Sequence, residues 1–204
     1  MSTIYLRRAK LADLNTIMEI IEEARKALKE AGNPQWQDGH PNRAMISRDI
    51  SQEISWVLIV NNRIAGTAVL QLAPEPSYQN ISNGQWSHPH APYATIHRVA
   101  ISSSYRGQGL AKFLFSNLIT VGQLQGRNDF RLDTHEKNKQ MQRLARNLGF
   151  VRCGNVTVND KNDPRRLAAI MPSEYTDEIE NSSMYSEGIF LWGENLNTPQ
   201  KQSY

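Results

Sequence analysis

The sequence predicts a mixed α/β domain, and two observations carry this prediction. Residues 94–158 alternate between apolar runs typical of strands and segments whose apolar residues recur every three or four positions, which is typical of helices. Two earlier strand-like runs, residues 56–60 and 64–72, are joined by Asn61-Asn62, which favours a tight hairpin turn. A chain of 204 residues is also long enough to bury a sizeable core.

The remaining elements follow in order along the chain. A helix is expected over residues 14–28, ended by Gly32-Asn33-Pro34, and a short helix around 44–53. Residues 73–92 are a long, proline-containing polar segment, which is typical of a functional or disordered loop. A strand at 94–101, a helix from 110, a strand at 130–134 and a helix after residue 138 come next. Closing strands are expected at 150–158 and 166–170, with a turn at 160–164.

The most informative segment is the glycine-rich turn at residues 106–111, Arg-Gly-Gln-Gly-Leu-Ala, between a predicted strand and a predicted helix. Glycine lets the backbone approach a ligand closely. The first turn of a helix presents unpaired N–H groups and the positive end of the helix dipole. Together these features indicate a site for a diphosphate.

Two motifs that use such a turn fit poorly. The loop of nucleotide hydrolases is excluded because Phe113 stands where its magnesium-binding hydroxyl belongs. The dinucleotide motif G-x-G-x-x-G lacks its third glycine, because Lys112 occupies that position. Since Asp129 and Asp133 lie at a tolerable distance for a ribose-binding acid, a dinucleotide-binding enzyme remains an alternative.

A third pattern, [RQ]-x-x-G-x-[GA], is met in full by Arg106, Gly109 and Ala111, and here the sequence resembles the GNAT superfamily of acyl-CoA N-acyltransferases. Val99-Ala100-Ile101 resembles the strand whose backbone lines the pantetheine arm of CoA in that family. Asn138, followed by Gly149-Phe150, resembles the family's asparagine-containing helix. As an architecture the resemblance covers roughly residues 4–171, and residues 5–13 look like its opening strand and helix start.

The resemblance implies a GNAT-like fold, with a central mixed, mostly antiparallel sheet of six or seven strands flanked by helices. It also implies acetyl-CoA as acyl donor, without a metal. The residues expected to bind the cofactor are Val99, Ala100, Ile101, Arg106, Gly107, Gln108, Gly109, Leu110, Ala111, Lys112 and Asn138. For Asn138 an ordinary helix N-cap role also remains open.

In such enzymes the amine attacks the thioester directly in a ternary complex, and a general base takes its proton. His97, on the strand before the glycine-rich turn, and His135, after the next strand, are the candidate catalytic residues. A partly buried structural histidine remains open for the first, and a capping or loop role for the second. Many family members carry a tyrosine that protonates the leaving thiolate, and Ala145 occupies that position here.

Three aromatic residues, Trp36, Trp86 and Tyr93, fall in segments that cover the acceptor site in similar proteins. They are candidate substrate-binding residues, although a core role is equally open. His88 and His90 are spaced like metal ligands, but no third ligand is obvious, so no metal site is predicted.

Charge divides the chain into two parts, a predicted domain at 1–172 and an acidic tail at 173–204. The tail has six acidic residues and one lysine, a net charge of −5. Because the whole chain has a net charge of +3, residues 1–172 have a net charge of +8. A basic domain suits an acidic ligand such as CoA, and no basic run with interleaved aromatics indicates nucleic acid. An aromatic patch at 189–192 favours docking of the tail on the domain or on a second protomer, so a homodimer is possible.

The single cysteine and the absence of a signal-peptide pattern or a long apolar run predict a cytoplasmic protein that is not in a membrane. The function predicted is N-acetyltransfer from acetyl-CoA to a primary amine of a small molecule or peptide. The alternatives are an inactive CoA-binding sensor or interaction module, which Ala145 favours, and a dinucleotide-binding enzyme.

Overall fold

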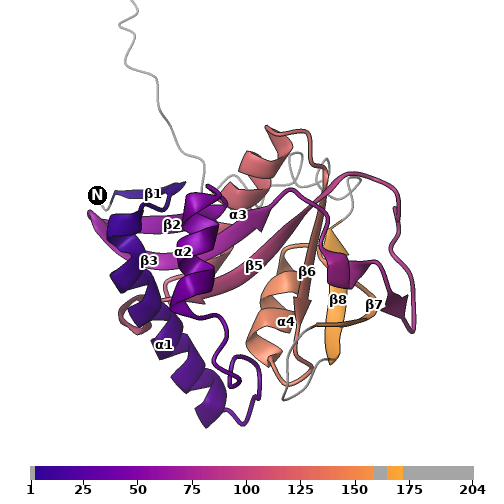
Figure 1. Ribbon diagram of the computed structural model, residues 1–204, viewed down its shortest axis with the longest axis horizontal. Coiled ribbons are helices and arrows are strands. Elements are labelled where there is room, and N and C mark those ends of the chain that lie inside the picture. Colours follow the sequence, from indigo (N-terminus) through magenta and orange to yellow (C-terminus); the bar gives the residue numbers. More distant parts are fainter. Residues whose placement is uncertain (1–2, 159–164, 172–204) are drawn as a thin grey trace, which may run out of the picture.

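The chain folds around a single twisted sheet with helices on both faces (Figure 1). The computed structural model describes residues 3–158 and 165–171. The sheet order is β1-β2-β3-β5-β6-β8-β7-β4, antiparallel throughout except for the parallel pair β5–β6. The strands are β1 (Ile4–Arg8), β2 (Ser55–Val60), β3 (Arg63–Gln71), β4 (Ile81–Ser82), β5 (Tyr93–Ile101), β6 (Asp129–Thr134), β7 (Val151–Thr157) and β8 (Arg165–Met171). The helices are α1 (Leu14–Glu30), α2 (Arg43–Ser51), α3 (Leu110–Gln123) and α4 (Lys139–Asn147), with short 3₁₀ turns at Leu11–Asp13, Pro76–Tyr78 and Ser103–Tyr105.

The helices divide the core into two apolar layers. Residues of α1 and α2, such as Ile21 and Ile46, pack with Val57 and Ile59 on one face of the sheet. Residues of α3 and α4 pack on the other face with the alternate residues of the same strands, such as Leu58. Side chains in a strand point alternately to its two faces, so the continuous apolar run of β2 is explained by burial on both sides.

Local signals in the sequence account for the element boundaries. Asn42 caps α2, its side chain accepting a hydrogen bond from the Met45 N–H at 3.0 Å. Between β2 and β3, Asn61 and Asn62 both adopt positive φ values, 49° and 63°, as a tight hairpin turn requires.

The predicted mixed, mostly antiparallel fold is confirmed. The sheet has eight strands in the described residues, against the six or seven expected, because the segment 73–92 contributes the two-residue strand β4. That segment covers a packed layer formed by two of its aromatic residues: Tyr78 and Trp86 are 2% and 5% exposed, and the Trp86 indole donates to the Tyr78 carbonyl at 3.0 Å. The predicted turn at 160–164 and the predicted tail at 173–204 lie outside the described residues.

Two irregularities in β5 shape the functional region. Val69 of β3 lies opposite His97, and Thr67 lies opposite Ala100, so two residues of β5 bulge opposite Ala68. In addition, β5 pairs with β6 only over residues 93–95, and the two strands diverge beyond that point. The divergence leaves the second half of β5 without a neighbour on that side, so this edge is open to a ligand.

Candidate functional site

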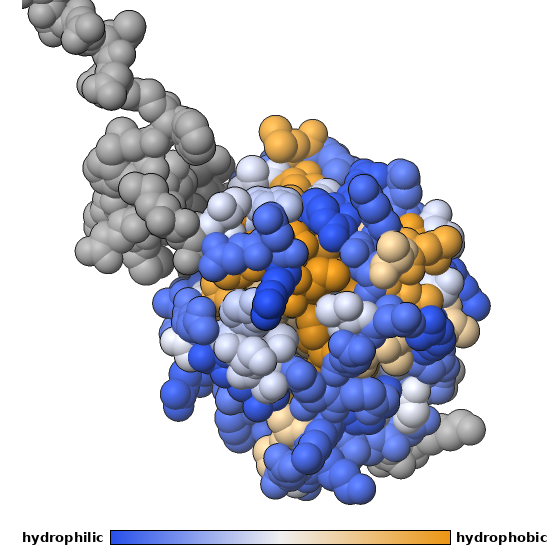
Figure 2. Space-filling view, turned by 90° about the vertical axis from the view of Figure 1, so that its left-hand side faces the viewer, coloured by the Kyte–Doolittle hydropathy of each residue, from blue (hydrophilic) through white to orange (hydrophobic). Residues whose placement is uncertain are grey.

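A cavity of about 1240 Å³ opens where β5 and β6 diverge. Its walls are the second half of β5, the end of β6, the C-terminal half of α1, the segment 33–41, the glycine-rich turn and the start of α4. On the face drawn in Figure 2, apolar surface lies recessed between hydrophilic residues. The cavity itself is lined by apolar residues such as Leu28 and Ile96 together with polar ones such as Asn33 and Lys112. A mixed lining of this kind is typical of small-molecule sites.

The glycine-rich turn at residues 106–111 borders this cavity with an open backbone. Gly107 and Gly109 adopt positive φ values of 78° and 71°, and a Cβ atom on either would meet no atom within 4 Å. Gly109 is the N-cap of α3, so the N–H groups of Leu110 and Ala111 have no partner inside the helix. Because Lys112 also lines the cavity, the turn offers backbone donors and a cation to one ligand, which fits a diphosphate.

The cofactor residues expected on β5, Val99, Ala100 and Ile101, all line the cavity. They belong to the part of the strand that lacks a β6 neighbour. Of the turn, Arg106, Gly107, Gly109, Leu110, Ala111 and Lys112 line it too, whereas Gln108 does not.

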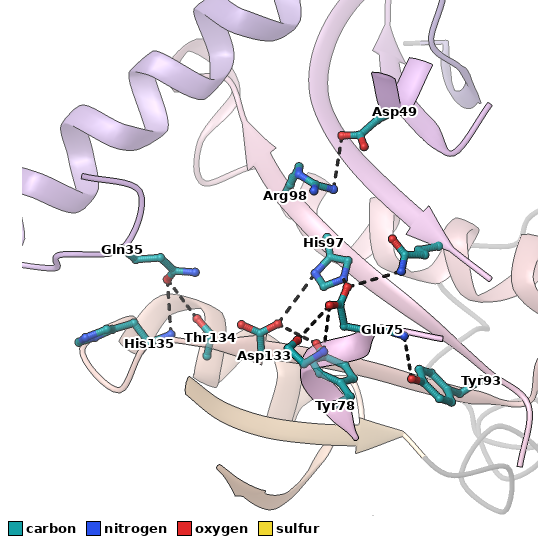
Figure 3. A network of polar contacts seen from close by, with 12 residues as sticks. Gln35, Asp49, Glu75, Tyr78, Tyr93, His97, Arg98, Asp133, Thr134 and His135 are labelled. Carbon is teal, nitrogen blue, oxygen red and sulfur yellow. Dashed lines mark hydrogen bonds and ion pairs between the residues drawn. The ribbon is translucent and has the colours of Figure 1, made fainter. Parts of the chain in front are cut away.

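Asn138 lines the cavity and is also the N-cap of α4. Its Oδ1 accepts from the Met141 N–H at 3.1 Å, and its Nδ2 donates to Oε1 of Gln35 at 3.0 Å. Gln35 belongs to the segment after α1, so this contact ties that segment to the opposite wall of the cavity. Gln35 also accepts from the Thr134 hydroxyl and the His135 N–H at 3.4 and 3.5 Å (Figure 3). The N-cap role that the sequence left open is therefore present.

His97 occupies the centre of a polar network at the cavity wall (Figure 3). Its Nε2 lies 3.3 Å from Oε2 of Glu75, and its Nδ1 lies 3.9 Å from Oδ1 of Asp133. The same Oδ1 accepts a 2.7 Å hydrogen bond from the buried Tyr78 hydroxyl. Nε2 is a buried atom, and at 3.3 Å its contact with Glu75 is an ion pair whose geometry falls short of an aligned hydrogen bond.

The carboxyl group of Glu75 is strongly perturbed. The neighbouring His97 lowers the pKa of Glu75 to about 2, against the opposing effect of burial. Its backbone N–H donates to the Tyr93 hydroxyl at 2.9 Å, which fixes the loop at this point. Burial raises the pKa of Tyr78, which therefore acts as a hydrogen-bond donor to Asp133.

The other predicted candidates occupy different surroundings. His135 is 1% exposed, its Nδ1 accepts from the Lys137 N–H at 3.0 Å, and it does not line the cavity. Trp36 lines the cavity. Trp86 and Tyr93 do not, because they enclose the guanidinium of Arg131 at 4.3 and 3.7 Å and so belong to the packed layer under residues 73–92.

Ala145 is 4% exposed and packs in the core on the α3–α4 face, so no proton donor stands at that position. His88 faces Asp129 at 3.2 Å. Within the described residues no group of three or more histidine, cysteine or acidic side chains could hold a metal ion. None of the helices described there has the length and apolar character needed to cross a bilayer.

The sequence did not identify three residues of the site, Glu75, Arg98 and Asp49. Glu75 lies in a loop far from any motif, and Asp49 lies on a short amphipathic helix where an acidic residue is ordinary. Arg98 lines the cavity and pairs with Asp49 at 3.3 Å. Only its place next to His97 in the sequence could have pointed to it.

Comparisons with known proteins agree with this geometry. The model of the acetyltransferase (GNAT) family matches residues 17–150. Among solved structures, a GNAT family acetyltransferase from Streptococcus agalactiae is 38% identical, with a TM-score of 0.75 over 83% of this chain and 95% of that chain. A search of curated protein sequences found no match.

Two less similar structures support the fold alone. A GNAT family acetyltransferase from Listeria monocytogenes is 19% identical, with a TM-score of 0.64 over 82% of this chain and 93% of that chain. The PaiA N-acetyltransferase from Thermoplasma acidophilum, solved in complex with coenzyme A, is 15% identical, with a TM-score of 0.63 over 83% and 99% of the two chains.

Proposed function

The chain belongs to the acetyltransferase (GNAT) family, and on that premise we propose that it transfers the acetyl group of acetyl-CoA to a primary amine of a small molecule or peptide. The observation that carries the proposal is the position of His97, which faces the same cavity as the open glycine-rich turn. An anion site and a titratable base in one cavity are what transfer from an acyl-CoA to an amine requires.

Acetyl-CoA, when bound, supplies an activated thioester. The glycine-rich turn binds its diphosphate through the N–H groups at the start of α3, helped by Lys112. The unpaired edge of β5 at Val99–Ile101 binds the pantetheine arm and directs backbone N–H groups at the thioester carbonyl, where negative charge develops.

His97 takes the proton of the acceptor ammonium, directly or through one water. Glu75 and Asp133 hold the imidazole between them and attract the ammonium, because together they carry more negative charge than one imidazolium neutralises. Ala145 offers no proton, so the departing thiolate takes its proton from water. We assign no catalytic role to His135, which does not line the cavity.

The test is calorimetric titration of the protein with acetyl-CoA, with NAD as the comparison ligand. Saturable binding of acetyl-CoA without a response to NAD is expected. Gly109→Asp puts a carboxylate against the diphosphate and is expected to abolish binding. Gly126→Asp is the matched control, because Gly126 has a similar φ of 72° and equally open space but lies after α3, away from the cavity.

Undiminished acetyl-CoA binding by Gly109→Asp would remove the turn from the site, and preference for NAD would favour a dinucleotide enzyme. The mostly antiparallel sheet already differs from the parallel sheet of dinucleotide-binding folds. A second candidate function, CoA binding without catalysis, is favoured by Ala145. It predicts acetyl-CoA binding with no thiol release in the presence of any amine.

A further inference from the structure

We propose that Arg98 binds a carboxylate of the acceptor, so that the substrate is a free amino acid, whose amine and carboxylate share one carbon. The inference rests on the proposed function and names the substrate class of the same cavity. It comes from the bulge in β5, from the unused donors of Arg98 and from the distribution of charge around His97.

The bulge brings His97 and Arg98 to one face of the sheet. Ile96, Val99 and Ile101 contribute to the core on the α3–α4 face. His97 follows Ile96 and therefore points to the opposite face, and Arg98 reaches Asp49 of α2 on that same face. In a regular strand two consecutive side chains would point to opposite faces, so the bulge is what places a base and a guanidinium side by side.

The backbone of Arg98 is strained. Its φ is 53°, in the left-handed region that a residue with a Cβ atom rarely adopts. Strain of this kind persists only where the surrounding structure enforces it, and it clusters at functional sites. A glycine or an asparagine would adopt this φ with less strain, so the backbone conformation does not account for an arginine at this position. We therefore attribute the arginine to the function of its side chain.

The guanidinium of Arg98 has donors to spare. Its Nη1 lies 3.3 Å from Oδ2 of Asp49, whose side chain is 7% exposed, and neither atom makes an aligned hydrogen bond. In residues 3–158 and 165–171 the other N–H groups of Arg98 have no hydrogen-bond partner either, although the side chain lines the cavity. A guanidinium has five N–H donors, and a planar carboxylate matches two of them at once.

Two other shielded arginines show what a structural role looks like in this protein. Arg25 donates to the carbonyls of Trp36 and Pro41 at 3.0 and 2.8 Å and so fastens the segment after α1. Arg131 donates to the His88 carbonyl at 2.8 Å between two aromatic rings. Arg98, by contrast, is held by one buried carboxylate and faces the cavity, as an anion receptor would be.

The charges around His97 and Arg98 favour an acceptor that carries both a positive and a negative group. Glu75 and Asp133 surround a single imidazole, so the His97 side attracts an ammonium. The next residue, on the same face of the sheet, offers a guanidinium to the same cavity. An amino acid brings an ammonium for the first group and a carboxylate for the second, whereas a polyamine would place a second cation against Arg98.

The experiment compares acceptors that differ only in the carboxylate. With acetyl-CoA saturating, kcat/KM is measured from thiol release for each amino acid, for its carboxamide and for the amine without the carboxyl group, alongside phosphoethanolamine and short peptides. We expect amino acids to be preferred by about 10- to 100-fold, the range of a charge-assisted hydrogen bond.

Variants separate binding by Arg98 from simple structural pairing. Arg98→Gln alone leaves Asp49 buried without its partner and risks misfolding. The double variant Arg98→Gln with Asp49→Asn removes both charges, and we expect it to bind acetyl-CoA normally while losing the preference for amino acids. Arg98→Lys keeps the charge without the planar fork and should retain part of the preference.

Equal kcat/KM for acids and carboxamides would overturn the inference, as would a preference for plain amines or for the phosphate-bearing amine. A preference that survives in the double variant would overturn it too. Acetyl-CoA binding with no amino acid accepted would overturn the inference while leaving the proposed function in place. Loss of acetyl-CoA binding by the wild type is a different result, because it removes the proposed function itself.

Discussion

At the scale of single residues, the position of His97 between two carboxylates leads to the first prediction. His97→Ala should leave acetyl-CoA affinity nearly unchanged, because the contacts proposed for the cofactor come from the glycine-rich turn and from Val99–Ile101 and not from His97. Turnover should fall by about 10²- to 10⁴-fold, the usual contribution of a general base. The pH–rate profile should lose its limb near neutrality. An unaltered profile would remove His97 as the base, and His135→Ala serves as a control for removing an imidazole elsewhere.

Glu75 links the same network to stability. Its folded-state pKa of about 2 lies below the ordinary 4.5, so the ionised form favours the folded state. This contribution is fully present above pH 4.5 and is lost as the pH falls toward 2. The shift sets an upper limit of about 3 kcal/mol on the contribution of this carboxylate to the free energy of unfolding. Glu75→Gln should therefore be less stable than wild type at pH 7, with the difference shrinking as the pH falls.

Urea unfolding of both proteins at a series of pH values between 7 and 3 measures this difference. Glu19→Gln is the matched control, since Glu19 is exposed on α1 and makes no ion pair within the described residues. A constant difference between wild type and Glu75→Gln across the series would show that the carboxylate does not stabilise the fold through its charge.

Sequence alone made His97 a candidate base because it sits on the strand that leads into the glycine-rich turn, and the structure places it at the cavity. It could not find Glu75, which comes from a loop 22 positions earlier and meets His97 only through the packing of residues 73–92. Nor could it decide between the cavity and the core for Trp86 and Tyr93. That choice depends on Arg131, whose burial between the two rings leaves no signal in the chain.

At the scale of elements, the close contact between α3 and β6 is set by Gly122. A Cβ atom there would lie 2.4 Å from Cε1 of Phe130, which is fully buried. Gly122→Ala gains about 1 kcal/mol of helix propensity, but overpacking a core costs about 1–3 kcal/mol. We expect a net loss of about 1 kcal/mol in the free energy of unfolding.

A double-mutant cycle tests this contact. In a Phe130→Leu background the added methyl group has more room, so Gly122→Ala should cost less or become stabilising. Neither residue lines the cavity, so acetyl-CoA affinity should not change. Equal costs in both backgrounds would contradict the proposed clash.

Most elements were predictable because their signals are local. The asparagine pair between β2 and β3 specifies its turn, and the apolar spacing specifies α1 and α3. The bulge at Arg98 was not predictable, because β5 reads as an uninterrupted strand. The extra residue shows itself only in the register against β3, which is set by distant pairing.

At the scale of the whole molecule, the sheet consists of two parts with a narrow junction. One part is β1-β2-β3-β5 and the other is β6-β8-β7-β4, and between them β5 and β6 pair only over residues 93–95. The order of motifs in the sequence predicted the fold as a whole, but not this junction, because strand divergence is a property of three-dimensional pairing.

A ligand bound between the diverging strands should connect the two parts. Acetyl-CoA at 100 times its dissociation constant should raise the free energy of unfolding by about 2.7 kcal/mol. If the ligand contacts both β5 and β6, the gain should also appear as slower amide hydrogen exchange in both parts of the sheet, β6 and β8 included. Gly109→Asp should show neither effect, and Gly126→Asp should show both. Slower exchange confined to the glycine-rich turn and α3 would mean that the ligand contacts only one part, so the pantetheine arm would have to lie outside the gap between β5 and β6.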